Sequence, residues 1–222
     1  MRYNSHVGRR PGPTEQGLRT RNTILRRAAE VASVEGLERL SIGPLAEELR
    51  LSKSGLFAHF GSKEELQLAT IETARRLYVQ EVIVPARAVG SGLSELRALC
   101  DGFLSYVERR VFPGGCFFAS AMAEFHSRPD SPVRDQITNC QTQWLTALER
   151  AAQAAVERSQ LRPGTDPTQV AFELEAALLS ANWYFHLYRD TSYLRRARDA
   201  VRGRLLQDAT PRGRSLISEE EN

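Results

Sequence analysis

Lysine is nearly absent from this chain: Lys53 and Lys63 are the two lysines among its 30 basic residues. Cysteine is scarce too, with three widely spaced residues, Cys100, Cys116 and Cys140. An odd number at such spacing neither builds a disulfide framework nor matches the ligand pattern of a zinc site. We therefore expect reduced thiols in a cytoplasmic protein, with no metal site and no cofactor.

Long apolar runs are missing as well. No uninterrupted apolar stretch approaches the roughly 20 residues that a membrane span needs. The opening MRYNSHVGRRPGP lacks the apolar core of a signal peptide. Hydrophobic residues make up 41% and charged residues 26% of the 222, which is ordinary for a soluble globular protein. We expect a protein without membrane contact, long enough for one large domain or two small ones.

The sequence does not indicate β-strands, because alternating runs of β-branched residues are almost absent and apolar residues recur every three or four positions. This spacing predicts an all-α fold. The first 17 residues contain two prolines and three glycines, which predicts a disordered basic arm over 1–17. The polar segment 210–222 is expected to be a disordered tail.

The charge is distributed unevenly. Residues 1–63 hold eleven basic and six acidic side chains, a net of +5, whereas residues 64–222 carry a net of −2. A basic front on a slightly acidic body is typical of a polyanion-binding module joined to a neutral domain. A GC-rich genome, which favours arginine codons, would explain why lysine is rare. It does not explain why both lysines fall in the basic front.

Serine caps and glycine stops divide this front into short helices. The expected helices are 20–35, ended by Gly36; 43–49, capped by Ser41; 53–60, capped by Ser52 and ended by Gly61; and one from Lys63, opened by a Ser62–Glu65 capping box. The second and third, joined by a turn at Arg50 and Leu51, have the spacing of a helix-turn-helix, which the first helix braces.

The third helix has one anchored face and one free face. The expected core of the motif comprises Leu45, Ala46, Leu49, Leu51, Leu56 and Phe60. Leu56 and Phe60 are four apart and anchor one face, so the opposite face presents Lys53, Ser54 and Phe57, with His59 near the end. Small residues beside them would let this helix approach base edges in a major groove. Lys63 begins a helix, where a cation is unfavourable unless a phosphate faces it.

The run from Arg21 to Lys63, above all LSKSGLFAHFGSKEEL, resembles the DNA-binding domain of the tetracycline-repressor (TetR) family. The resemblance covers about fifty residues. It implies base-edge contacts from Gly43, Ser52, Lys53 and Ser54, and contacts to the DNA backbone from Gly55, Phe57, His59 and Lys63. The family usually has tyrosine where this chain has Phe57, so one phenol hydrogen bond to phosphate is missing.

Several of these residues also have plainer interpretations. His59 and Lys53 could be ordinary surface residues. Arg9, Arg10, Arg19 and Arg21 could grip the minor groove or neighbouring phosphates, or belong to a merely solubilising tail. The expected domains are a helix-turn-helix domain over 18–63, with its motif at about 41–60, and a larger helical ligand-sensing and dimerisation domain over 64–209.

The second domain has its own caps and stops. Its expected helices run from Lys63 to a point before Pro85, then over 93–111, 117–125, 131–160, 166–189 and 193–207. The resemblance implies that the last two form an intersubunit four-helix bundle, which suits a homodimer on a palindromic operator. A small and apolar spine, Ala171, Leu174, Leu178 and Ala181, is either that interface or internal core.

Aromatic and soft apolar side chains in the middle helices are candidates for a ligand pocket. They are Phe103, Tyr106, Phe118, Met122, Phe125, Trp144 and Trp183, with Glu124 and His126 as polar points. Pockets for small molecules have this mixture, and so do ordinary cores. We expect an unidentified small apolar or aromatic effector.

The sequence therefore predicts a DNA-binding transcriptional regulator, a ligand-responsive repressor that binds double-stranded operator DNA as a homodimer. No phosphate loop, nucleophile elbow or metal-ligand cluster suggests an enzyme. Two alternatives stay open: a thiol- or redox-responsive regulator that uses Cys116, and a DNA-binding protein that needs no ligand.

Overall fold

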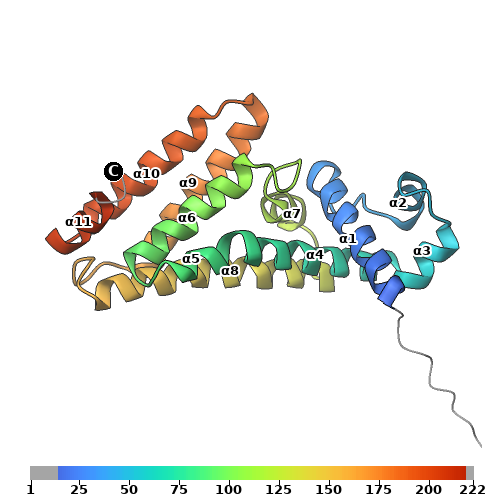
Figure 1. Cartoon of the computed structure of the whole chain (residues 1–222), viewed down its shortest axis with the longest axis horizontal. Helices are drawn as coiled ribbons and strands as arrows, with labels where there is room; N and C mark the ends of the chain where they lie inside the picture. The colour runs from blue at the N-terminus through green and yellow to red at the C-terminus, as the bar shows by residue number, and fades with distance from the viewer. Residues whose placement is uncertain (1–14, 219–222) are drawn as a thin grey trace, which may run out of the picture.

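The computed structural model describes residues 15–218, and in this range the chain is helical, with an isolated bridge between Leu161 and Ala209 and no strand (Figure 1). The prediction of an all-α fold is confirmed. None of the described helices is long and apolar enough to cross a membrane.

The N-terminal unit consists of α1 (Glu15–Glu35), α2 (Ile42–Glu48) and α3 (Lys53–Phe60). Its boundaries follow the predicted signals. Gly36 ends α1 with φ of +92° and Gly61 ends α3 with φ of +71°, a backbone region that favours glycine. The Ser52 hydroxyl caps α3 by accepting a hydrogen bond from Gly55 N at 3.0 Å. These caps and stops determine where α1 ends and where α3 begins and ends.

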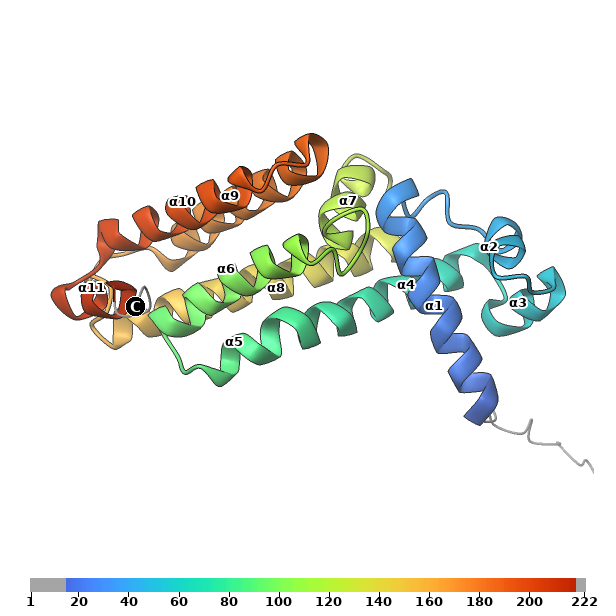
Figure 2. The same cartoon turned by 45° about the horizontal axis from the view of Figure 1, so that its top comes forward.

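The larger unit is built on long helices that run along the molecule (Figures 1 and 2). In chain order they are α4 (Lys63–Tyr78), the π-helical turn η1 (Val79–Ile83), α5 (Val84–Ala88), α6 (Leu93–Glu108), α7 (Phe117–Phe125), α8 (Pro132–Glu157), α9 (Pro167–Tyr188), α10 (Ser192–Asp208) and α11 (Pro211–Ser218). The short α7 lies beside α1, and α9 and α10 form an antiparallel pair at the end farthest from α3.

Four sequence predictions need correction. Residues 15–17 are helical, whereas the predicted disordered arm included them; residues 1–14 lie outside the described part. The helix from Lys63 does not stop before Pro85 but continues to Ala88. Pro85 lies in the first turn of α5 directly after a widened π turn, where the altered hydrogen-bond pattern tolerates a residue without an N–H. Leu51, expected in the core, is 40% exposed because it lies in the turn.

The predicted disordered tail is the fourth correction, because Pro211–Ser218 forms α11. This helix is held by packing rather than by its own composition. Ile217 is 1% exposed, and Arg97 donates a hydrogen bond to Leu216 O at 3.0 Å. Such long-range anchoring cannot be read from a polar local sequence.

Candidate DNA interface and ligand cavity

Helix α3 has a buried face and a free face, as predicted. Leu56 is 0% and Phe60 2% exposed, and they pack into the N-terminal core. On the other face Lys53, Ser54 and Gly55 are exposed, His59 is half-buried, and Phe57 is 56% exposed. A large aromatic ring left in solvent costs apolar hydration, which suits a ring that meets a partner surface.

The four predicted base-facing residues come together at the N-terminal end of α3. Ser52 and Ser54 are neighbours there, with their hydroxyl oxygens 3.4 Å apart. A Cβ on Gly43 of α2 would lie 3.7 Å from Lys53 Cε, so the lysine stem passes over this glycine. The Ser52 hydroxyl oxygen already accepts the capping bond, which leaves its proton for another acceptor.

Both lysines are paired with glutamates. Lys53 Nζ lies 3.1 Å from Glu47 Oε1, and Lys63 Nζ donates to Glu38 Oε1 at 2.7 Å. The hydrogen bond from Lys63 lowers the pKa of Glu38, so this carboxylate is ionised at neutral pH. Pairs this exposed contribute about 0–1 kcal/mol each. A phosphate can therefore displace either glutamate at little cost.

The arginines expected to reach DNA differ in their surroundings. Arg9 and Arg10 lie outside the described residues. Arg19 and Arg21 belong to α1, where Arg19 pairs with Glu15 at 2.6 Å and the Arg21 guanidinium lies 4.9 Å from the centre of the Phe60 ring. Arg21 therefore packs against Phe60 at the C-terminal end of α3.

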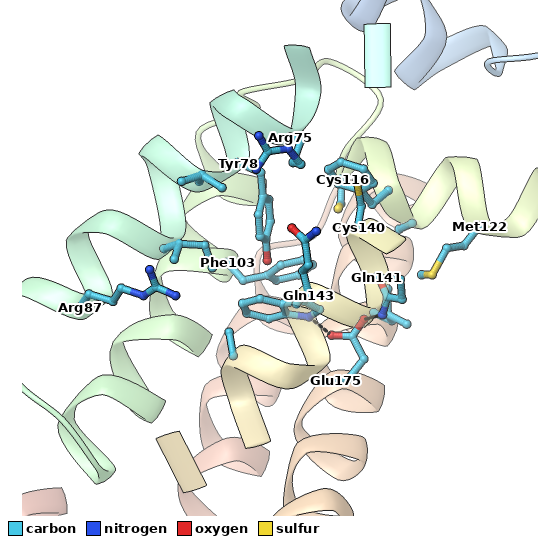
Figure 3. Close-up of a pocket in the computed structure, with 17 residues that line it drawn as sticks. Arg75, Tyr78, Arg87, Phe103, Cys116, Met122, Cys140, Gln141, Gln143 and Glu175 are labelled. Atoms are coloured by element: carbon cyan, nitrogen blue, oxygen red, sulfur yellow. Dashed lines mark hydrogen bonds between the residues drawn. The ribbon is translucent and has the colours of Figure 1, made fainter. Parts of the chain in front are cut away.

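A cavity of about 250 Å³ opens among α4, η1, α5, α6, α7, α8 and α9 (Figure 3). Four of the predicted pocket residues line it together: Phe103, Phe118, Met122 and Trp144. Tyr78 adds a further ring, which stands edge-on to Trp144 with 5.4 Å between ring centres. The predicted segment around α7 thus supplies one wall of the cavity.

The other four predicted pocket residues lie elsewhere. Tyr106 and Phe125 are buried in the core beside the cavity without lining it. His126 is exposed at the end of α7, and Trp183 is 50% exposed on the outer face of α9. Residue type alone could not separate these positions, because the inward direction of each helix is set by its neighbours.

The sequence analysis missed the one carboxyl group in this lining, Glu175 on α9. It is 7% exposed, and it accepts hydrogen bonds from Trp144 Nε1 at 2.5 Å and Gln141 Nε2 at 2.9 Å (Figure 3). Burial raises the pKa of this carboxyl group, against the pull of both N–H donors. A signal existed: Glu175 falls on the buried face of α9, between Leu174 and Leu178.

Two arginines that the sequence analysis did not single out also line the cavity. Arg75 is held by Glu72 through two hydrogen bonds of 2.8 Å. Arg87 is exposed at the α5 end.

Two thiols face the cavity as well. Burial raises the pKa of Cys116 to about 12 and that of Cys140 to about 11, so both are protonated at neutral pH.

Glu124, expected as a polar point of the pocket, instead joins the two units. Its carboxylate accepts from Leu37 N at 2.7 Å and from Glu38 N at 3.2 Å, just after α1. Arg128 lies 3.4 Å from Glu38 Oε2 on the same side. Helix α7 therefore touches the cavity on one face and the loop before α2 on the other. Among the described residues no cluster of three or more His, Cys, Asp or Glu could hold a metal ion.

Comparison with known families gives matches over both units. Residues 24–70 match the family described as bacterial regulatory proteins, tetR family. Residues 92–201 match the family described as tetracyclin repressor-like, C-terminal domain. A comparison with curated proteins gives no match.

Solved structures share the fold at low sequence identity. A TetR transcriptional regulator from Chloroflexus aurantiacus J-10-FL is 24% identical, with a TM-score of 0.80 over 88% of this chain and 98% of that one. A TetR-family regulator from Cytophaga hutchinsonii is 21% identical, with a TM-score of 0.74 over 89% and 98%. AibR, solved with isovaleryl coenzyme A and operator DNA, is 22% identical, with a TM-score of 0.62 over 81% and 94%.

Proposed function

Because the chain belongs to the tetracycline-repressor (TetR) family of bacterial regulatory proteins, we propose that it is a ligand-responsive repressor. It binds a palindromic operator in double-stranded DNA as a homodimer and is released by a small apolar or aromatic effector. AibR, which has the same fold, was solved with both a ligand and its operator.

The observation that carries the proposal is the course of α4. Its first residue, Lys63, lies next to α3, while Arg75 and Tyr78 near its other end line the cavity. A helix is stiff over this length, so a ligand that displaces the cavity end moves the DNA end as well. A shift in the separation of two recognition helices would cost affinity for a palindrome, and a coupling of about 1–3 kcal/mol makes a useful switch.

The exposed face of α9 supports the homodimer. Phe172, Trp183 and Leu187 are 66%, 50% and 70% exposed and follow one another along this face, with Tyr184 and Tyr188 beside them. A monomer seldom leaves such a continuous apolar stripe in water, and a second copy of the same chain would cover it symmetrically. The spine that the sequence suggested, Ala171 to Ala181, is internal core at 0–3% exposure.

The redox alternative has less support. Cys116 is 3% exposed, and its raised pKa leaves almost no thiolate, the form that reacts with oxidants. The cavity, for its part, argues against a DNA-binding protein that needs no ligand. We therefore keep the ligand-responsive repressor.

The direct test is selection of genomic DNA fragments by the purified protein, followed by a salt titration on the best fragment. We expect a short palindrome bound with nanomolar affinity and a steep salt slope, because several phosphates are neutralised together. Lys53→Glu should abolish the enrichment, while Arg150→Glu, the same charge change at an exposed position of α8 outside the cavity lining, should leave it intact. If no sequence is enriched, the specific-repressor proposal fails.

A further inference from the structure

The one carboxyl group of the cavity lining has no cationic partner among the described residues. Glu175 is 7% exposed, and among the described residues it forms no ion pair. Its two hydrogen-bond donors, the Trp144 indole and the Gln141 amide, are both neutral. A buried carboxylate without a counter-charge is costly, so the site gains when a cation enters it.

The hydrogen bonds favour the ionised form of this carboxyl group. Each oxygen accepts one N–H bond, Oε1 from Gln141 and Oε2 from Trp144. A carboxylate has acceptor sites left on both oxygens after these bonds, whereas a protonated carboxyl would have to place its proton between existing donors. The two donors thus oppose the rise in the pKa of Glu175 that burial causes, and a cation bound beside the carboxyl group would favour its ionised form further.

Aromatic rings in the cavity lining are grouped to one side of this carboxylate (Figure 3). Trp144 lies nearly parallel to Phe103 and perpendicular to Tyr78, with ring centres 6.2 Å and 5.4 Å away. Phe118 stands edge-on to Tyr78 at 6.1 Å. Faces of Trp, Tyr and Phe attract cations through their quadrupoles, most strongly where water is excluded. A cluster of aromatic rings beside a buried carboxylate has the chemistry that recognises an organic ammonium group.

The two arginines of the lining do not reverse this sign. Arg75 is neutralised by Glu72 through two hydrogen bonds. Arg87 is exposed, so water and salt screen its charge, whereas the charge of Glu175 acts at short range in a medium of low dielectric constant. The field at the bottom of the cavity is therefore that of the carboxylate.

We propose that the effector is a compact organic cation, a quaternary or tertiary ammonium with an aromatic or apolar body, and that Glu175 is its counter-ion. This inference rests on the proposed function, in which the cavity is the effector site. A volume of about 250 Å³ lies below the roughly 300–1,000 Å³ of sites for drug-sized molecules, so the ligand is small.

The test uses three probes of nearly one shape: benzyltrimethylammonium, its uncharged carbon isostere neopentylbenzene, and the anion 3-phenylpropanoate. The full chain carries Trp183→Phe, so that Trp144 in the cavity is its one remaining tryptophan and reports binding by its fluorescence. We expect the cation to bind at least about tenfold more tightly than the neutral isostere, and the anion most weakly.

Glu175→Gln should bring cation and isostere to within about threefold while leaving the affinity for the isostere unchanged. Glu149→Gln, the same charge change on α8 outside the cavity lining, is the matched control and should keep the preference. Should Glu175→Gln fail to fold, Phe118→Leu serves instead: loss of one ring face should weaken the cation more than the isostere.

Equal affinity for cation and isostere, a preference for the anion, or an undiminished preference in Glu175→Gln would each overturn this inference. So would the absence of binding by all three probes. DNA selection is carried out without ligand, so a failure of the cation proposal remains distinguishable from a failure of the DNA-binding proposal.

Discussion

The two functional ends of the molecule handle charge in opposite ways. At the α3 end, Lys53 and Lys63 are exposed and already paired with Glu47 and Glu38. At the cavity end, Glu175 is buried and held by neutral donors. Exposed pairs are weak and exchange their partners readily, whereas a buried charge stays unsatisfied until a complementary group arrives. One end is suited to swap a carboxylate for a phosphate, and the other to hold a single chosen ligand.

Two elements connect these ends and do so differently. Helix α4 runs without a break from Lys63 to Tyr78. Helix α7 reaches across through Glu124, which bonds Leu37 N and Glu38 N, and Glu38 in turn pairs with Lys63. A change in the cavity can thus reach Lys63 both along the helix α4 and through a chain of polar contacts from α7. Predictions that separate the two ends therefore also test the connection.

The largest effect is expected from charge reversal at the DNA end. Lys63→Glu should weaken operator binding about 10- to 100-fold, because it removes a phosphate contact and adds repulsion. The midpoint of urea unfolding should stay nearly unchanged, since the pair with Glu38 is exposed. Operator affinity and unfolding are measured on the same preparation. Unaltered binding would remove Lys63 from the interface.

The connection through α7 should show in stability. Glu124→Ala leaves the N–H groups of Leu37 and Glu38 without their acceptor, and we expect a loss of about 1–3 kcal/mol in the free energy of unfolding. Glu124→Gln retains an acceptor oxygen and should lose clearly less. Chemical denaturation of both variants gives the comparison. Equal stability of wild type and Glu124→Ala would mean that the contact contributes nothing.

The cavity end should show in the pH dependence of stability. Burial raises the folded-state pKa of Glu175, so its carboxyl binds a proton more tightly in the folded chain than in the unfolded one. Its contribution to stability is fully present below the unfolded pKa of about 4.3 and is lost as the pH rises through the folded pKa. The free energy of unfolding of Glu175→Gln should therefore rise relative to wild type over this window.

This difference between two proteins cancels the groups that they share. Glu38, Glu72 and Asp208 have lowered pKa values and favour the folded state as the pH rises, equally in both proteins. Urea unfolding at intervals between about pH 4 and pH 7.5 measures the trend. A difference that stays constant with pH would show that Glu175 titrates as it does in the unfolded chain.

The smallest effect concerns Phe57. Phe57→Tyr restores the phenol that is usual in the family, and we expect operator binding to tighten about two- to tenfold through one added hydrogen bond to phosphate. Because the ring is 56% exposed, stability should not change. Phe57→Leu, which keeps an apolar group but has no ring, is the control. Weaker binding by the tyrosine variant would place this ring against an apolar part of the DNA.

Most of the N-terminal unit could be predicted from local sequence signals. Ser52, Gly36, Gly61 and Ser62 act within one or two turns of their own position, so the C-terminal end of α1, both ends of α3 and the start of α4 could be predicted closely. The exposed face of α3 followed from two residues four apart, Leu56 and Phe60. The position of Leu51 could not be predicted, because an apolar residue in a turn may face either way.

The cavity was predictable only in part. Four of its rings and soft side chains were recognised by type, yet Glu175 was missed and Trp183 was misplaced. Both belong to α9, whose rotation about its axis is set by its packing against α8 and α10, with contacts such as Trp144 to Glu175 that are 31 residues apart. The same reason explains α11, whose polar residues become ordered through Ile217 and Arg97.

The sequence by itself determined the all-α class, the order of most helices, the helix-turn-helix and the family, because caps, stops and apolar spacing act over a few residues. The tertiary structure decided which faces are inside: that Ala171 to Ala181 is core, that the outer stripe of α9 is free, that Glu124 joins the two units, and that a carboxylate stands among the cavity's rings. Burial is a property of neighbours brought together by packing, and packing depends on residues that are distant along the chain.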